Sequence, residues 1–232
     1  MNKMILLAGM CFAFVVQARA SDTSGYCGPK DKNGDYGTNC QWNYDADTKT
    51  LKIFGTGGMY TSPSTHDHPW SKGTSYYDEI ENVVIEDGIT SIGGHAFYGA
   101  KELKNIILPD TLTSIGWNVF KDTNITSVVV PDSVTYIGGS ATSHAPFNSI
   151  MTEVYCSKAQ EEMCAKYVSW SGLDEGVLKT YQKDGSAYYY DGRFYDSPKD
   201  IGLHNPIKKR IYTIDEANKV TGRKNTFKIR YK

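Results

Sequence analysis

"IILPDTLTSIG", Ile106 to Gly116, occurs in two further versions in this chain of 232 residues. One version, "VVIEDGITSIG", begins at Val83, and the other, "VVVPDSVTYIG", begins at Val128. Apolar residues recur at the same offsets in each version, where one apolar residue is exchanged for another. Three copies with steps of 23 and 22 residues indicate a repeat architecture, because self-similarity at a fixed period marks stacked supersecondary units.

Each copy predicts two short strands joined by a turn. Neither a 3.6-residue nor a 2-residue hydrophobic period runs through the whole unit, which excludes a long helix or a long strand. The run Val83–Ile85 fits one strand, and Pro109 or Pro131 ends it by removing a backbone donor. A glycine closes each phrase, where we expect a corner at which a positive φ costs little: Gly93, Gly116 and Gly138.

One such coil cannot bury its apolar side alone, so we expect the copies to stack. Stacking places Ile85, Leu108 and Val130 over one another and joins their surroundings into one core column. The predicted fold class is therefore mainly β, as a short solenoid of three full repeats. A decayed fourth repeat begins at Met151, with Val154 and Cys156 at matching offsets.

The motif "IxxVVIxDGITSIGxxAFYGAxxLxxIILPDTLTSIG" resembles the BspA-type leucine-rich repeat, built on L-x-x-I-x-I-P-x-x-V-x-x-I-G-x-x-A-F. The resemblance is close over 80–147 and loose over 151–156, and Trp42 to Trp70 resembles a segment that often precedes such repeats. It implies a surface or secreted binding protein of bacteria or their eukaryotic neighbours, sometimes an adhesin, without shared catalytic residues. The insertion "GGSATSHAPF" in the third copy departs from the pattern.

The first twenty residues predict a secretory signal peptide, 1–20. Lys3 precedes an apolar run from Met4 to Val16, and Ala18-Arg19-Ala20 fits a cleavage site after Ala20. The apolar run is too short for a spanning helix, which needs about 20 residues. We expect a secreted or cell-surface protein without a transmembrane segment after cleavage. The formal net charge of −1 does not favour nucleic acid as a partner.

Four cysteines remain after the signal peptide, and four cysteines allow three pairings. We favour Cys27–Cys40 and Cys156–Cys164, because each pair is local and flanks a different end of the repeats. A zinc site is the competing interpretation, but the spacings are not C-x₂-C, and an exported chain favours oxidation.

The repeats predict a division into three regions after residue 20. These are an N-terminal cap with a β-hairpin (21–79), the repeats (80–156) and a C-terminal α+β region (157–232). The hairpin is expected from Gln41–Tyr44 and Thr50–Phe54. The C-terminal region is expected to hold a helix, a hairpin, two helix starts and a last strand, at Lys158–Val168, Tyr188–Tyr195, Ser197–Asp200, Thr213–Glu216 and Thr226–Tyr231.

No catalytic, metal or cofactor site is expected. His66-Asp67-His68 comes closest to a metal cluster, but it lies in a Ser/Thr/Pro-rich stretch without a third ligand nearby. A G-x-S-x-G nucleophile turn does not occur in the chain. The least favoured hypothesis is an enzyme on the C-terminal region, which would need a polar pocket around Tyr188–Tyr190 and Asp191.

The open face of the strands is the candidate binding surface. Its residues are an outward-pointing apolar series and the polar series beside it: Val84, Ile107, Val129 and Tyr155, with Asn82, Asn105, Ser127 and Glu153. Stacked strands lie about 4.8 Å apart, so the first series forms a continuous strip that suggests a protein, peptide or glycan partner. Two alternatives remain, namely plain β-propensity and cover by the tail. The second functional hypothesis is a structural envelope component anchored through its C-terminal tail.

Overall fold

The computed structural model describes residues 23–195 apart from 66, 72–73, 140–143, 185–186 and 191–192. The described part is mainly β with few helices, as the sequence predicts. The strands are β1 (Ser24–Lys30), β2 (Tyr36–Asp45), β3 (Thr50–Gly55), β4 (Gly57–Gly58), β5 (Asn82–Ile85), β6 (Ile89–Ile92), β7 (Asn105–Ile107), β8 (Ser114–Ile115), β9 (Ser127–Val129), β10 (Tyr136–Ile137), β11 (Glu153–Ser157), β12 (Leu178–Asp184), β13 (Ala187–Tyr190) and β14 (Arg193–Tyr195). The helices are α1 (Glu161–Trp170) and the 3₁₀ turns η1 (Tyr77–Glu79), η2 (Lys158–Gln160) and η3 (Glu175–Val177).

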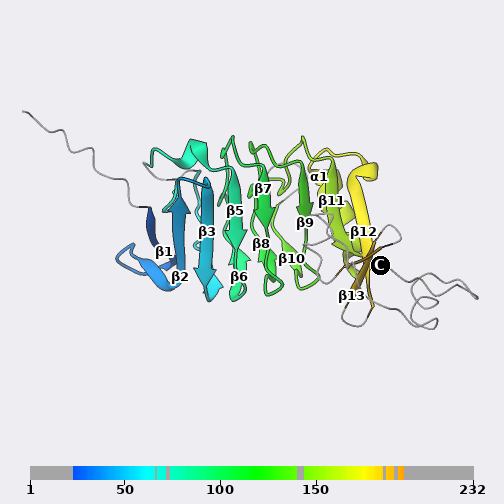
Figure 1. The fold of residues 1–232 in the computed structure, drawn as a ribbon, viewed down its shortest axis with the longest axis horizontal. Coiled ribbons are helices and arrows are strands. Elements are labelled where there is room, and N and C mark those ends of the chain that lie inside the picture. Colours follow the sequence, from blue (N-terminus) through cyan, green and yellow to red (C-terminus); the bar gives the residue numbers. More distant parts are fainter. Residues whose placement is uncertain are drawn as a thin grey trace, which may run out of the picture.

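One face of the molecule is a row of parallel strands. Figure 1 shows β3, β5, β7, β9, β11 and β12 side by side along the long axis. Strand β5 pairs with β3 and β7, so that Val83 lies between Leu51 and Ile106. Strand β11 pairs with β9, with Val154 opposite Val128. The fourth copy therefore stacks on the third in the register that its sequence predicts.

The second face is a shorter parallel sheet in the order β10-β8-β6-β4. Ile115 pairs with Ile92 on one side and with Ile137 on the other. Each of the three full repeats thus contributes one strand to each face, and β-branched residues occupy both because they pack well on a pleated surface.

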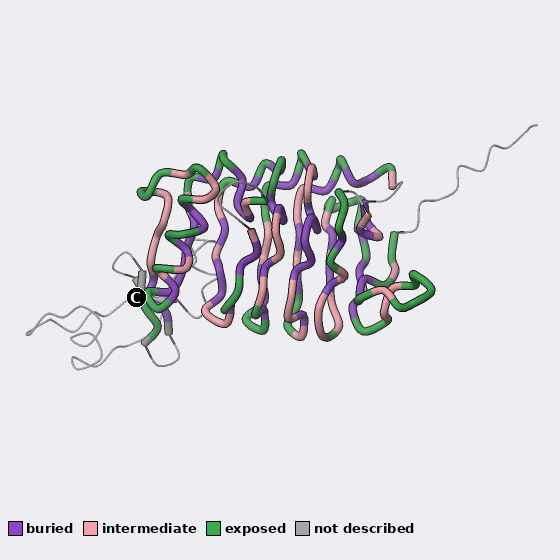
Figure 2. The backbone as a smooth tube through the Cα atoms, turned by 180° about the vertical axis from the view of Figure 1, so that it is seen from behind, coloured by how far each residue is buried: buried purple, intermediate pink, exposed green. Residues whose placement is uncertain are grey.

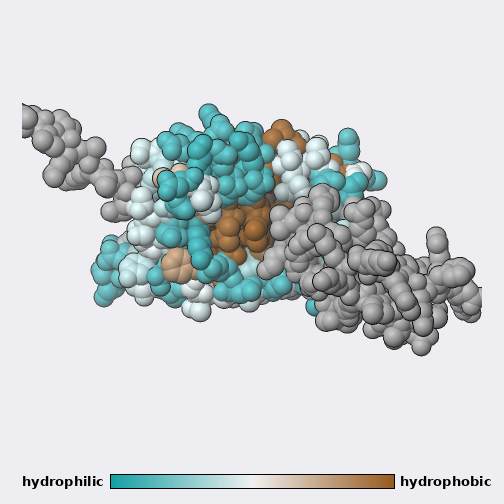
Figure 3. All heavy atoms as spheres, viewed as in Figure 1, coloured by the Kyte–Doolittle hydropathy of each residue, from teal (hydrophilic) through white to brown (hydrophobic). Residues whose placement is uncertain are grey.

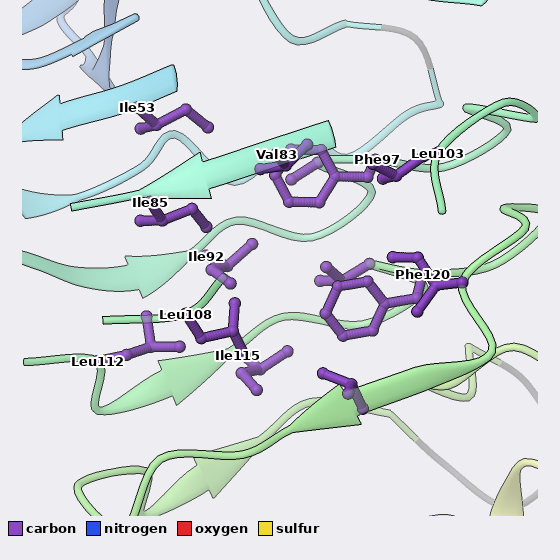
Figure 4. Packing of buried hydrophobic residues seen from close by; sticks show 14 of the residues in the cluster. Ile53, Val83, Ile85, Ile92, Phe97, Leu103, Leu108, Leu112, Ile115 and Phe120 are labelled. Carbon is purple, nitrogen blue, oxygen red and sulfur yellow. The ribbon is translucent and has the colours of Figure 1, made fainter. Parts of the chain in front are cut away.

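The core lies between the two faces. Ile85, Leu108 and Val130 are each at most 3% exposed and belong to one hydrophobic cluster, as their offsets predict. In Figure 4, Phe97 and Phe120 lie one over the other, while Ile85 and Leu108 point toward the same interior. Figure 2 shows buried segments on the inner side of every coil. The cluster runs without interruption along the stack, because each coil buries its apolar side against the next.

Each end of the stack carries a disulfide. Cys27–Cys40 joins β1 to β2, which pairs with β3 in an antiparallel hairpin as expected. Cys156–Cys164 joins β11 to α1. Both predicted pairings are confirmed, and the zinc interpretation is wrong because the four sulfur atoms are bonded in two separate pairs.

Helix α1 packs against β11 and β12 and buries Cys164, Tyr167 and Val168. The chain enters it through η2, at whose start Ser157 and Gln160 form a capping box.

Strands β13 and β14 form the hairpin predicted at Tyr188–Tyr195, with Tyr190 opposite Arg193. The helix starts at Ser197–Asp200 and Thr213–Glu216 and the strand at Thr226–Tyr231 lie outside the described residues.

The repeat glycines have a different role from the predicted one. Positive φ angles occur two residues later, at His95 (60°) and Asn118 (53°), and not at Gly93 or Gly116. A Cβ on Gly116 would lie 2.7 Å from the backbone carbon of Gly93 in the preceding coil. On Gly138 it would lie 2.9 Å from the backbone nitrogen of the coil before. Glycine is required here because two backbones approach too closely for any side chain.

Gly116→Ala should therefore lower the free energy of unfolding by about 3 kcal/mol, since the clash is with backbone that cannot turn aside. The matched control is Gly176→Ala in η3, where an added Cβ meets nothing within 4 Å. Urea denaturation of both variants measures the difference. Equal stabilities would contradict close coil-to-coil approach at this glycine.

Candidate binding groove

The row of parallel strands is interrupted between β7 and β9. Strand β7 ends the sheet β1-β2-β3-β5-β7, and β9 ends the sheet β14-β13-β12-β11-β9. Each strand therefore pairs with a neighbour on one side only and presents a free edge to the other. The two edges face each other with Cα atoms within 8 Å, which is less than the roughly 9.6 Å that an inserted strand would need.

A groove of about 570 Å³ lies over this break. Its apolar walls are Val84, Ile106, Ile107, Val128 and Val129. Figure 3 shows the corresponding apolar patch in the middle of the face, bordered by polar side chains. The groove is an open, apolar trough on the surface predicted for binding.

The polar series beside the strip forms a hydrogen-bonded ladder along the sheet. The Asn105 side chain donates to Asn82 Oδ1 at 2.9 Å, and the Asn82 side chain donates to the Thr48 carbonyl at 3.2 Å. The ladder fixes both amides at the rim of the groove. Lys104 lies on the same rim and pairs with Glu81 at 3.5 Å.

Three of the four predicted apolar residues line the groove, and the fourth does not. Val84, Ile107 and Val129 are half-buried, whereas Tyr155 is 1% exposed. Tyr155 packs with Tyr181, Tyr188 and Tyr195 in a second cluster, here called the tyrosine cluster. At this end of the strip, downstream residues therefore cover the apolar series, because β12–β14 extend the sheet and bury its outer face.

The tyrosine cluster is locked onto the repeats by polar contacts. Tyr181 Oη donates to the Val130 carbonyl at 2.9 Å, and Lys183 pairs with Asp132 at 3.1 Å. Burial raises the pKa of Tyr181, so its hydroxyl remains a donor at ordinary pH. Tyr188 lies edge-on to Tyr181 within the cluster, and Asp191 lies outside the described residues.

Sequence reasoning missed Ile106, which the repeat pattern predicts as core. It is half-buried and lines the groove, since no hydrogen-bonded strand covers it on the β9 side. The sequence does carry a signal for the break. The connection from Phe120 to Ile125 is one residue shorter than the connection from Phe97 to Leu103, which accounts for the change of step from 23 to 22.

The sequence predicts that His66-Asp67-His68 is not a metal site, and His66 lies outside the described residues. Among the described residues, no group of three His, Cys, Asp or Glu side chains could hold a metal ion. His68 is fully buried, its Nε2–H donates to the Gly94 carbonyl at 2.9 Å, and its ring stacks on Trp70. Asp67 binds Lys30 at 3.4 Å. The described residues of this segment therefore pack against the N-terminal end of the stack.

The comparisons with known proteins agree with the repeat pattern. Residues 71–169 match the family described as BspA type leucine rich repeat region, in six copies. The repeat segment of this chain is therefore a BspA-type leucine-rich repeat region, and the resemblance predicted from the sequence is confirmed. A search of the curated proteins found no match.

Solved structures of three leucine-rich repeat proteins are similar to this chain. A leucine-rich repeat protein from Eubacterium ventriosum has 20% identity and a TM-score of 0.42, over 68% of this chain and 46% of that one. The Leucine Rich Repeat protein of T. pallidum has 17% identity and a TM-score of 0.32, over 63% and 80%. A leucine rich cell surface protein from Faecalibacterium prausnitzii has 15% identity and a TM-score of 0.19, over 69% and 59%. This chain spans less than half the length of the first of these proteins.

Across the described residues, no helix combines the length and the apolar character needed to cross a membrane.

The buried histidine gives a pH dependence whose sign can be worked out. Desolvation lowers the pKa of His68 to about 4, from an ordinary value of 6.5. The unfolded chain binds the proton in this window and the folded chain does not, so stability is complete above about pH 6.5 and falls as the pH drops toward about 4. The loss attributable to His68 should reach about 3 kcal/mol.

His68→Gln keeps an amide donor for Gly94 and removes the titration, and His144→Gln removes an exposed histidine as the control. Urea denaturation between pH 7 and pH 4 should show a shallower decline for His68→Gln than for the wild type or the control. Parallel curves for all three proteins would show that His68 is not the titrating group.

Proposed function

We propose that this chain is a short leucine-rich-repeat solenoid that serves as a non-enzymatic binding module, secreted or displayed at a cell surface. The groove over the break between β7 and β9 takes an extended segment of a partner protein or peptide. One observation carries the proposal, namely an open apolar trough over the break between β7 and β9 with amide and hydroxyl groups at its rim. In this arrangement, the apolar walls take the side chains of an extended segment, and the polar groups of the rim hydrogen-bond its backbone.

The lining of the groove favours a peptide over a glycan. Its described lining residues are mainly aliphatic, with amide, hydroxyl, Lys and Asp groups at the rim and no aromatic side chain. Tyr and Trp platforms supply much of the contact area in many recognition surfaces, and here the tyrosines are buried in the neighbouring cluster. The aliphatic walls Val84, Ile107 and Val129 suit the apolar side chains of a peptide, and the rim amides suit its backbone groups.

Two features support an exported location. Both disulfides are of the kind that persists in oxidising compartments. The predicted signal peptide, 1–20, lies outside the described residues and remains a prediction.

A charge placed in the groove should abolish peptide binding. The test variant is Val84→Glu with Ile107→Glu, and the control is Thr113→Glu with Thr135→Glu on exposed positions of the other face. Peptides selected from a display library on the mature wild-type protein should bind the test variant at least tenfold more weakly, or about 1.4 kcal/mol, because a carboxylate must then be desolvated. The control should bind as the wild type does.

Circular dichroism and thermal unfolding establish that both variants are folded. Undiminished binding by a folded test variant would remove the groove as the binding site.

A further inference from the structure

The connection before β9 holds an acceptor sequence for N-linked sugar. Asn124-Ile125-Thr126 is the one N-x-S/T triplet in the 232 residues, and its middle residue is not proline. In exported proteins this triplet is where N-linked oligosaccharides are attached, on surface segments. A triplet of this kind also occurs by chance, so the place of these residues in the fold is decisive.

The fold presents Asn124 and Thr126 to solvent and buries the residue between them. Both are exposed, whereas Ile125 is 0% exposed within the core. The Asn124 N–H donates to the Leu103 carbonyl at 3.0 Å, and the Thr126 carbonyl accepts from the Thr152 N–H at 2.8 Å. These bonds hold the segment between the preceding and the following coil. The alternation of burial then places the amide and the hydroxyl together on the outer side.

The Asn124 amide is not used by the fold. In the part of the chain that the structure describes, neither its side chain nor the Thr126 hydroxyl makes a hydrogen bond. Other asparagine amides are occupied, since Asn105 donates to Asn82 and Asn39 donates to a backbone carbonyl. A sugar on Asn124 therefore breaks no described hydrogen bond, and its exposed side chain leaves room for a bulky group.

The repeat pattern does not account for the triplet. The positions that correspond to Asn124 in the first two copies hold Glu79 and Glu102, and those that correspond to Thr126 hold charged residues as well. The apolar offset between them is kept in all three copies. The third copy thus has an amide and a hydroxyl where stacking alone requires only polar surface.

We propose that Asn124 carries an N-linked oligosaccharide in the exported protein. A transferase joins Asn124 Nδ2 to the anomeric carbon of the sugar, while the bond from that carbon to a polyprenyl diphosphate donor breaks. The diphosphate leaves with the bonding electrons, and the amide loses one proton. The inference rests on the exported location proposed above and goes beyond the binding function. Because Thr126 lines the groove, the sugar stands beside the rim of the binding surface.

Mass spectrometry of the full chain, produced in its native cells, tests the modification. After reduction, trypsin releases residues 122–158 as one peptide, which contains the triplet. Its mass should exceed the sequence mass by the summed mass of hexose or N-acetylhexosamine units, and fragmentation should place them on Asn124. Asn124→Gln and Thr126→Ala should each abolish the addition. Thr126→Ser keeps the hydroxyl and should retain it, as should Asn43→Gln, which changes an exposed asparagine outside such a triplet.

The possible failures can be distinguished. A mature wild-type protein that lacks residues 1–20, has both disulfides and shows the unmodified peptide mass would overturn the inference and leave the exported location intact. An unmodified protein that keeps residues 1–20 would overturn both. Sugar that persists in Asn124→Gln would lie on another residue and would overturn the assignment to Asn124.

Discussion

The fold depends on how closely each coil approaches the next. Gly116 lies against the backbone of Gly93 and Gly94, and Gly138 lies against Gly116 and Trp117, with no room for a Cβ at either position. This approach brings Ile92, Ile115 and Ile137 into one parallel register on one face, and it holds the aliphatic column together. Dispersion falls off steeply with separation, so a small increase in the distance between coils would weaken every contact in the column.

The sequence predicts the column and the ends of the stack because these depend on local patterns. Ile85, Leu108 and Val130 are buried where their offsets place them, and two disulfides form between the nearest cysteines. The role of the repeat glycines was predicted wrongly. A glycine in a sequence can indicate a positive φ or a close approach, and only the neighbouring coil distinguishes the two.

The binding surface was predicted in part for a similar reason. Val84, Ile107 and Val129 line the groove as the alternation predicts, but Tyr155 is covered by strands that follow it in the chain. Its burial depends on how β12, β13 and β14 continue the sheet, which the repeat period does not encode. Ile106 is partly exposed because β7 and β9 do not pair. The connection from Phe120 to Ile125 is one residue shorter than the equivalent connection in the preceding copy, so the repeat length changes from 23 to 22 residues at this point.

The two ends of the row are covered, so the open part of the outer face lies in the middle. At one end β2 and β3 continue the sheet as a hairpin, and at the other the tyrosine cluster buries the outer face. The interrupted pairing lies between them, where the edges of β7 and β9 face each other with Cα atoms within 8 Å. Exposed edges invite uncontrolled association in many β proteins. Here each edge shields the other, because an inserted strand would need about 9.6 Å between them. The apolar walls of the groove therefore stay open to side chains, while the two edges do not template further growth of the sheet.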